Sequence, residues 1–340
     1  MIDLIKNLCE LDGISGREKA VWDYIISCIK DYADEITVDP LGNLIVFKKG
    51  RYRATKKVLL DAHADEVGFI ITCINSDGTL SFDCVGGIRT SVLLGRAVTV
   101  GDNKINGVIG VTPVHLLAAD KKAELPKVST LCIDIGATSK EDAQKLVSIG
   151  DMACFKSEFV EFGDGYIKAK ALDDRVGCAI LIDMIKSDLP YDLYFNFSAG
   201  EEVGAGMAGT AVYTVKPDYA IVVETTTAAD LAGVAENKTV CKLGDGGVVS
   251  FMDKRTLYDK TLFDRAFEIA KEKNIKLQTK TMVAGGNNAG VIHTAAGGVK
   301  TVAVSVPCRY LHSPSCVIKA DDVYETEKII CALAEDFAND

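Results

Sequence analysis

The order of predicted elements changes twice along this chain, and this change constrains its fold more than any single motif does. Residues 1–66 read as helices followed by extended segments, and residues 67–160 contain short β segments separated by Gly or Asn-Asp. Helices alternate with strands again after that stretch. A chain of 340 residues also exceeds the usual size of one compact core. We therefore predict an α/β fold in which residues 1–66 and 161–340 form one domain, with a central mixed sheet flanked by helices, interrupted by an inserted small β-barrel-like domain of residues 67–160.

The N-terminal residues predict helices and no membrane segment. Asp3 and Lys6 interrupt the apolar residues of MIDLIKNLCE, which favours an amphipathic helix over a secretory signal. Ser15 and Glu18 have the spacing of a capping box ahead of the segment AVWDYIISCI. No stretch approaches the roughly 18 uninterrupted apolar residues that a membrane-spanning helix needs. A membrane is therefore not an expected partner.

Composition narrows the class of partner and the compartment. The net charge is −10, with acidic residues spread along the chain, whereas binding to phosphates needs clustered Lys and Arg. Nucleic acid is therefore not expected to bind. The 11 cysteines contain no C-x-x-C pair and mostly lie in apolar runs, where Cys behaves as a small hydrophobic residue. Reduced thiols in a cytoplasmic protein are the preferred interpretation.

Several acidic and imidazole side chains follow apolar strands at the points where the strands end. Such groups are costly at the rim of a buried sheet unless their charge is compensated, and two adjacent divalent cations would compensate several of them together. The pattern therefore predicts a dinuclear metallohydrolase. The residues concerned are His63, Asp65, Asp173, Asp174, Glu201, Glu202, Glu224 and His312.

Each of these signals is weak alone. In each pair of adjacent acidic residues, we expect the two side chains to have different roles. One of Asp173 and Asp174 is expected to cap the following helix, so we assign Asp173 to a metal and Asp174 to support or capping. Glu201 and Glu202 end an apolar strand ahead of a Gly-rich stretch, which indicates a tight turn at a cavity. Adjacent carboxylates do not suit a glycosidase, which needs two carboxyls facing each other across a bond. We expect one glutamate to bind metal and the other to remain free as a base.

Several segments together resemble one known family over nearly the whole chain. They are HAD at 63–65, IDIGATSKEDA, ALDDRVGCA, the EEVG turn, GGNNAG and VPCRYLHSP. In this combination and order they are similar to the tetrahedral dinuclear metalloaminopeptidases, the glutamyl, leucyl and deblocking aminopeptidase family that also includes proteins labelled cellulase M.

The resemblance implies a zinc-peptidase-like catalytic domain that removes N-terminal residues from short peptides. It also implies a homo-oligomer, usually a tetrahedral dodecamer, and two zinc or cobalt ions per subunit, with manganese possible. His63 and Glu224 would hold one metal, Glu202 and His312 the other, and Asp173 would bridge them. Glu201 would be the general base, and Asp65 would lie behind His63.

The chain departs from the family at three positions, and rival functions stay open. Glu224 and Asn288 stand where the family commonly has Asp, and Cys316 stands where an acid is common. Arg89 and Arg309 are candidates for contacting an acidic substrate side chain. A deacylase or carboxypeptidase-like amidohydrolase with the same metal chemistry is one alternative, and a non-catalytic assembly or binding protein is another. The single Trp disfavours a cellulase, which stacks aromatic residues on sugar rings.

Overall fold

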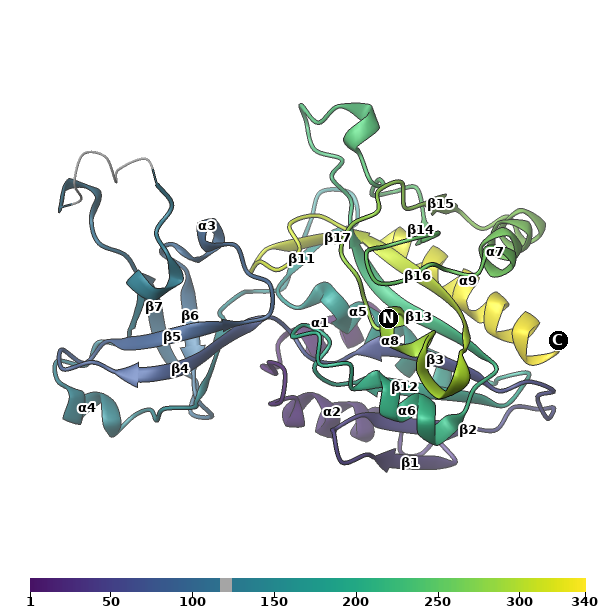
Figure 1. The fold of residues 1–340 in the computed structure, drawn as a ribbon, viewed down its shortest axis with the longest axis horizontal. Coiled ribbons are helices and arrows are strands. Elements are labelled where there is room, and N and C mark those ends of the chain that lie inside the picture. Colours follow the sequence, from purple (N-terminus) through teal and green to yellow (C-terminus); the bar gives the residue numbers. More distant parts are fainter. Residues whose placement is uncertain (117–123) are drawn as a thin grey trace.

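A mixed sheet of eight strands forms the centre of the larger part of the molecule (Figure 1). The structure is a computed structural model that describes residues 1–116 and 124–340. Across the sheet the strands are β1 (Glu35–Val38), β2 (Leu44–Lys48), β12 (Leu193–Ser198), β3 (Val58–His63), β13 (Tyr219–Thr227), β16 (Lys300–Cys308), β14 (Gly247–Val249) and β15 (Leu277–Thr279). The neighbours β12, β3, β13 and β16 run parallel. Their carboxyl ends therefore meet at one edge of the sheet, where α/β proteins place their binding sites.

Helices cover both faces of this sheet. Strand β3 is buried along its whole length, with Val58 and Leu60 in the core on one face and Leu59 in the core on the other. A strand covered on both sides reads as a continuous apolar run, as VLL at 58–60 does. The helices of the first face are α1 (Ile2–Cys9), α2 (Lys19–Ile29), α5 (Leu172–Lys186), α7 (Lys260–Lys273) and α9 (Ala320–Ala338), and those of the second are α6 (Ala208–Val215) and α8 (Ala289–Ile292). Within the described ranges, no helix has the length and hydropathy to cross a bilayer.

A closed β-barrel forms the smaller part of the molecule, at the left of Figure 1. Its core is aromatic, with the ring of Phe69 5.1 Å from that of Phe82 and 5.0 Å from that of Phe155. The barrel confirms the predicted fold class, a mixed α/β sheet interrupted by a β-barrel. Its strands are β4 (Gly68–Ile74), β5 (Leu80–Val85), β8 (Cys132–Asp134), β7 (Ile105–Gly110), β6 (Ala97–Val100) and β9 (Met152–Phe155), and the short helices α3 (Thr90–Leu93) and α4 (Lys140–Gln144) accompany them.

A second, three-stranded antiparallel sheet lies where the chain returns from the barrel. It consists of β10 (Val160–Phe162), β11 (Tyr166–Ala169) and β17 (Cys316–Lys319). The sequence pattern did not predict it, because strands of three or four residues carry almost no periodicity. Strand β17 follows the loop that carries His312, so this sheet anchors that loop.

The predicted capping box ahead of α2 is wrong. Glu18 itself occupies the position before the helix, and no side chain caps it. The Ser15 hydroxyl instead donates to Asp65 (2.6 Å), and the Glu18 carboxylate accepts from the Gly16 N–H (2.9 Å). Both side chains bind residues that are distant in the sequence, Asp65 and Gly200, and these contacts link the start of α2 to the ends of β3 and β12.

Candidate metal centre

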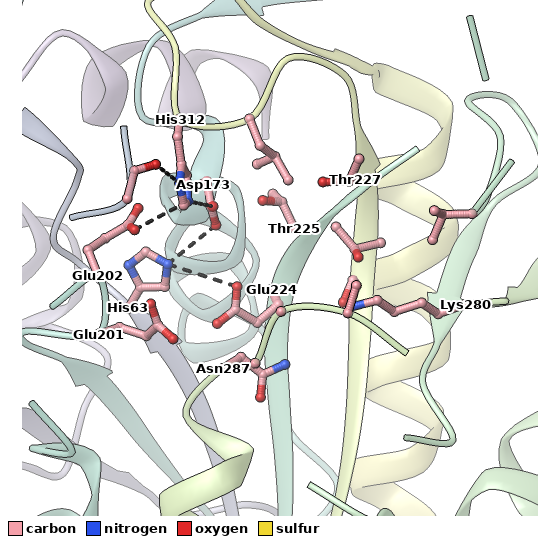
Figure 2. Close-up of a pocket in the computed structure, with 18 of the residues that line it drawn as sticks. His63, Asp173, Glu201, Glu202, Glu224, Thr225, Thr227, Lys280, Asn287 and His312 are labelled. Carbon is pink, nitrogen blue, oxygen red and sulfur yellow. Dashed lines mark hydrogen bonds and ion pairs between the residues drawn. The ribbon is translucent and has the colours of Figure 1, made fainter. Parts of the chain in front are cut away.

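The side chains predicted from the strand ends converge at the carboxyl edge of the parallel strands (Figure 2). His63 is the last residue of β3, and Glu201 and Glu202 follow β12. Glu224 lies within β13, and His312 lies in the loop between β16 and β17. Because the strands are parallel neighbours, the segments that follow them lie side by side. Residues separated by up to 249 positions in the chain therefore share one site.

Asp173 lies between the two imidazoles. Its Oδ1 is 3.3 Å from His63 Nε2, and its Oδ2 is 3.3 Å from His312 Nε2. His63 Nε2 is 3.9 Å from Glu224 Oε2, and His312 Nε2 is 3.3 Å from Glu202 Oε2. Each imidazole therefore faces one glutamate of its own and shares Asp173 with the other imidazole.

The far nitrogen of each imidazole is also held. His63 Nδ1 lies 3.1 Å from the backbone oxygen of Asp65 and 3.3 Å from its Oδ1. His312 Nδ1 lies 2.8 Å from the backbone oxygen of Gly87, a residue between the barrel strand β5 and α3. Such contacts fix the orientation and tautomer of an imidazole, so that Nε2 points into the site.

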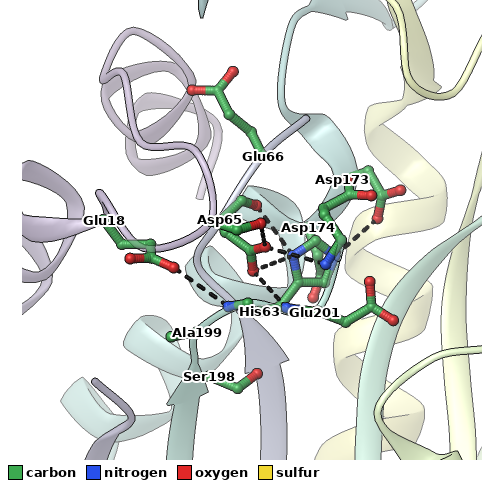
Figure 3. A network of polar contacts seen from close by, with 12 residues as sticks. Glu18, His63, Asp65, Glu66, Asp173, Asp174, Ser198, Ala199 and Glu201 are labelled. Atoms are coloured by element: carbon green, nitrogen blue, oxygen red, sulfur yellow. Dashed lines mark hydrogen bonds and ion pairs between the residues drawn. The ribbon is translucent and has the colours of Figure 1, made fainter. Parts of the chain in front are cut away.

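A buried network behind the site holds the turn that carries the two glutamates (Figure 3). The Asp65 carboxylate accepts from the backbone N–H of Glu201 (3.2 Å) and of Glu202 (3.1 Å). The Glu18 carboxylate accepts from the next N–H back along the chain, that of Gly200 (3.3 Å). Gly200 has a φ of +64°, which favours glycine at this turn. Three consecutive amides thus bind two carboxylates, and the turn is rigid where the side chains must be placed.

Asp173 and Asp174 make different contacts, although both lie near His63. Neither has helical backbone angles, so the regular turns of α5 begin after them. The Oδ1 of Asp174 accepts from the Gly177 N–H (3.0 Å), which is the contact of a helix cap. Asp174 also lies close enough to His63 and Glu224 to form a second possible metal-holding group with them.

Burial sets the protonation of the cluster. It raises the pKa of Glu201 to about 7. Burial and the neighbouring Asp173 raise the pKa of Glu202 well above its usual range. Burial would also raise the pKa of Asp173, but hydrogen bonds with His312 and His63 hold it below its usual range. Burial alone would lower the pKa of His312, yet Asp173 and Glu202 raise it to about 10. Without a metal ion, burial therefore favours the neutral form of Glu202, whereas the two imidazoles keep Asp173 ionised.

The residues present fit divalent metal ions. One possible ligand atom from each of His63, Asp173 and Glu202 lies within 4.8 Å of the other two. The same holds for one atom from each of His63, Asp174 and Glu224. One oxygen of Glu202 and one of Asp174 are buried without a hydrogen-bond partner among the described residues. A buried carboxylate oxygen left unpaired is costly unless a cation completes its surroundings. Imidazole and carboxylate together are the ligands of catalytic zinc and related ions.

A third acidic group, Asp12, Glu66 and Cys154, does not fit a metal in the same way. The Lys170 ammonium lies 2.6 Å from Glu66 Oε1 and 3.2 Å from Asp12 Oδ1, so a cation of the chain itself already neutralises this group. Burial and nearby Glu66 raise the pKa of the Cys154 thiol well above its ordinary value, which disfavours the thiolate that a metal needs.

The site opens into a cavity of about 630 Å³. The wall of this cavity also contains basic residues that the sequence pattern did not identify. Lys280 and Arg255 line it together with Arg89, one of the two predicted arginines. Lys280 follows the three-residue edge strand β15, too short to give a strand signal, so the sequence offered no reason to select it. The other predicted arginine, Arg309, is not free to bind substrate, because its Nε is 2.7 Å from Asp230 Oδ1.

Two of the three family departures lie beside the cavity and not in its wall. Asn288 is buried and donates to Asp61 Oδ2 (2.9 Å) and to Ser198 Oγ (2.7 Å). The Cys316 thiol donates to the backbone oxygens of Tyr310 and Ser313, on either side of His312. Both residues therefore support the walls of the site.

Comparison with known proteins gives the family. Residues 42–329 match the M42 glutamyl aminopeptidase family. The lysyl aminopeptidase of Pyrococcus furiosus is 31% identical, covering 98% of this chain and 96% of its own. An aminopeptidase structure from the archaeon Desulfurococcus kamchatkensis superimposes with a TM-score of 0.93 at 32% identity, covering 98% and 94% of the two chains. The TET1 peptidase of Pyrococcus horikoshii, described as assembling into a tetrahedron or a large octahedral shell, has a TM-score of 0.87 at 35% identity and covers 98% of each chain.

These matches extend across both the sheet and the barrel, and they agree with the resemblance noted in the sequence. The chain belongs to the M42 glutamyl aminopeptidase family and is a peptide hydrolase.

Proposed function

We propose that this chain is a dinuclear metalloaminopeptidase that hydrolyses the N-terminal peptide bond of short peptides. The observation that carries the proposal is the position of Asp173 between His63 and His312, each imidazole with its own glutamate. His63 and Glu224 would hold one ion, His312 and Glu202 the other, and Asp173 would bridge them. When bound, two such ions supply a nucleophilic water at neutral pH and polarise the carbonyl that is attacked.

Glu201 is the general base in this proposal. Its carboxylate forms no hydrogen bond or ion pair within the described ranges, whereas that of Glu202 faces His312. Burial raises the pKa of Glu201 to about 7, so it can take a proton at a carboxylate oxygen and return it to the departing amine. Asp65 orients His63 and holds the Glu201 backbone. A metal ion or a free carboxylate of the cluster would hold the free amino terminus of a peptide.

The inserted segment has a second role in the proposal. We assign residues 67–160 to a domain that controls oligomerisation and substrate access, and residues 1–66 and 161–340 to the catalytic domain. Gly87 contacts His312, and Arg89 lines the cavity, so the inserted segment reaches the site. The assembly reported for the TET1 peptidase supports a homo-oligomer such as a tetrahedral dodecamer, which light scattering coupled to size-exclusion chromatography tests.

The eleven free thiols support a reducing, cytoplasmic setting. Zinc, cobalt and manganese are the candidate ions. A panel of aminoacyl p-nitroanilides, assayed after metal stripping and after adding back each ion, tests the activity directly. The proposal expects turnover only with a metal and no cleavage of an N-acetylated peptide whose free-amine twin is cleaved. Release of acetate from the acetylated peptide, with the free-amine twin left intact, favours the deacylase alternative. The absence of turnover with any metal favours a non-catalytic protein.

A further inference from the structure

A buried polar network lies under the metal centre, and the proposed metal chemistry does not use it. Its central residue is Asp61 of β3, which is completely buried two positions before His63. Asp61 Oδ1 accepts from Asn196 Nδ2 (2.6 Å). Asp61 Oδ2 accepts from Asn288 Nδ2 (2.9 Å) and from the Ser198 hydroxyl (3.5 Å). In the described ranges, amides and a hydroxyl bind this carboxylate, and no lysine or arginine does.

The sheet register places this network one row below the metal-binding side chains. Side chains two residues apart on a strand lie on the same face, so Asp61 and His63 share the face of Leu59, which α6 and α8 cover. On the neighbouring strand β12, Asn196 is opposite Asp61, and Ser198 is opposite His63. After Ser198 the chain enters the turn that carries the two glutamates (Figure 3). The network therefore lies beneath both His63 and this turn.

Asn288 joins this network to the wall of the cavity. It stands at the start of α8, where its backbone oxygen accepts from the Ile292 N–H (2.9 Å). The preceding residues 284–287 line the cavity that also contains the carboxylate cluster, and Figure 2 shows Asn287 there. Besides Asp61, the Asn288 amide also binds Ser198 Oγ (2.7 Å), so one group contacts both β3 and β12. The wall at 284–287 is thus attached to the strands that carry the site.

The hydrogen bonds of this network have a direction, which apolar packing lacks. A carboxylate buried without a cation is costly, and apolar side chains of similar volume would fill the same space at a lower cost. The cost is offset only while each donor points at the Asp61 oxygens. This requirement fixes where Asn288 lies, and with it the wall at 284–287.

We propose that Asp61 and Asn288 are positioning residues, a carboxylate and amide pair that sets the place of the cavity wall at 284–287 relative to the metal centre. The inference rests on the proposed aminopeptidase function and adds two residues to its machinery. Neither residue needs to touch a metal ion or the substrate. The pair requires one carboxylate and one amide in contact, and either position can supply either group.

Exchanging the two groups tests the pair. Asn288→Asp places two carboxylates at the 2.9 Å contact, and the double variant Asp61→Asn/Asn288→Asp restores one carboxylate and one amide. In the double variant the amide oxygen on β3 still accepts from Asn196. Asn288→Asp should lower kcat/KM about 10- to 100-fold, since a displaced wall misplaces the substrate, and the double variant should return to within about threefold of wild type. Asn106→Asp, the same change at an exposed residue of β7, should leave kcat/KM unchanged.

Two measurements separate a loss of position from a loss of fold. The first is kcat/KM of the full-length protein at matched metal content, with the aminoacyl p-nitroanilide that wild type cleaves fastest. The second is urea unfolding of the metal-free variants, in which the double variant should be more stable than the sum of the single changes. If Asn288→Asp does not fold, Asp61→Asn takes its place, because one amide oxygen then receives two amide donors, and the double variant should recover its activity as well.

The outcomes separate the pair from the proposed function. A double variant that is no more active than the single variants refutes the positioning pair. A lower stability with unchanged kcat/KM refutes it too, because Asp61 and Asn288 then support only the fold. Both results leave the aminopeptidase function standing, since the wild-type protein still cleaves its substrate. If the wild-type protein cleaves no aminoacyl p-nitroanilide with any metal, the proposed function fails, and the positioning role fails with it.

Discussion

Lys170 is predicted to be one of the most important single residues for the stability of this protein. It follows β11, and only 5% of its side chain is exposed. Its ammonium lies 2.6 Å and 2.9 Å from the two oxygens of Glu66, 3.2 Å from Asp12 Oδ1 and 2.8 Å from the backbone oxygen of Leu11. Asp12 also contacts Lys104 of the barrel at 3.3 Å, so this network joins the barrel to the larger part of the molecule.

Replacing Lys170 with Met keeps the apolar stem and removes the charge, leaving two buried carboxylates without their main partner. Breaking a buried ion pair by removing one member costs about 3 to 5 kcal/mol. The cost should lie near 3 kcal/mol by the same rule, because Arg175 remains 3.5 Å from Glu66 and the more exposed Lys104 remains near Asp12. Lys168→Met is the matched control, since Lys168 lies on β11 and, among the residues that the structure describes, its ammonium binds only the Ser157 hydroxyl and the Glu158 backbone oxygen.

Urea unfolding followed by the fluorescence of Trp22, at one fixed protein concentration, measures the difference. Despite burial, Lys170 and Lys104 hold the pKa of Asp12 below its usual range. A lowered carboxyl pKa stabilises the fold above the unfolded pKa of about 3.9, and this stability is lost as the pH falls through the folded pKa. The gap between wild type and Lys170→Met should therefore narrow below about pH 4. A loss no larger than that of Lys168→Met at pH 7 would refute the reasoning.

Three further predictions concern catalysis, metal affinity and pH. Glu201→Gln should lower kcat by about 10²- to 10⁴-fold with unchanged metal content and circular dichroism, and near-normal turnover would remove Glu201 as the base. Asp65→Asn should weaken metal binding about 10- to 100-fold in a chelator competition, and unchanged affinity would contradict its orienting role. Burial raises the pKa of Asp322 to about 6, so the folded state binds its proton more tightly than the unfolded state and stability should fall as the pH rises from about 4 to 6. Asp322→Asn should flatten this slope in urea titrations, and an unchanged slope would show that Asp322 does not titrate in this range.

The site was predictable from sequence because of the geometry of parallel strands. His63, Glu202 and Glu224 follow or end long apolar runs, and the carboxyl ends of such strands must meet at one edge of the sheet. Asp173 contacts both imidazoles and Asp174 makes a cap contact, and neither residue has helical backbone angles where α5 begins. The roles of these residues in catalysis stay predictions.

Features that depend on distant or very short segments could not be predicted in the same way. Ser15 and Glu18 have the spacing of a cap, but they bind groups 50 and 182 residues away instead, the Asp65 carboxylate and the backbone N–H of Gly200. Strand β17 pairs with β11 across most of the C-terminal half, and no local pattern records that pairing. Lys280 and Arg255 lie in loops whose meeting point depends on the short strands β14 and β15.

Elemental analysis of the purified protein tests the central claim most directly. After dialysis against metal-free buffer, wild type should retain two transition-metal ions per chain, His312→Ala about one, and Asp173→Ala fewer still, because Asp173 contacts both imidazoles. Cys154→Ala, in the acidic group that Lys170 already neutralises, should retain both ions. A catalytically active wild-type protein with no bound transition metal, or one whose metal content is the same in all three variants, would contradict the account.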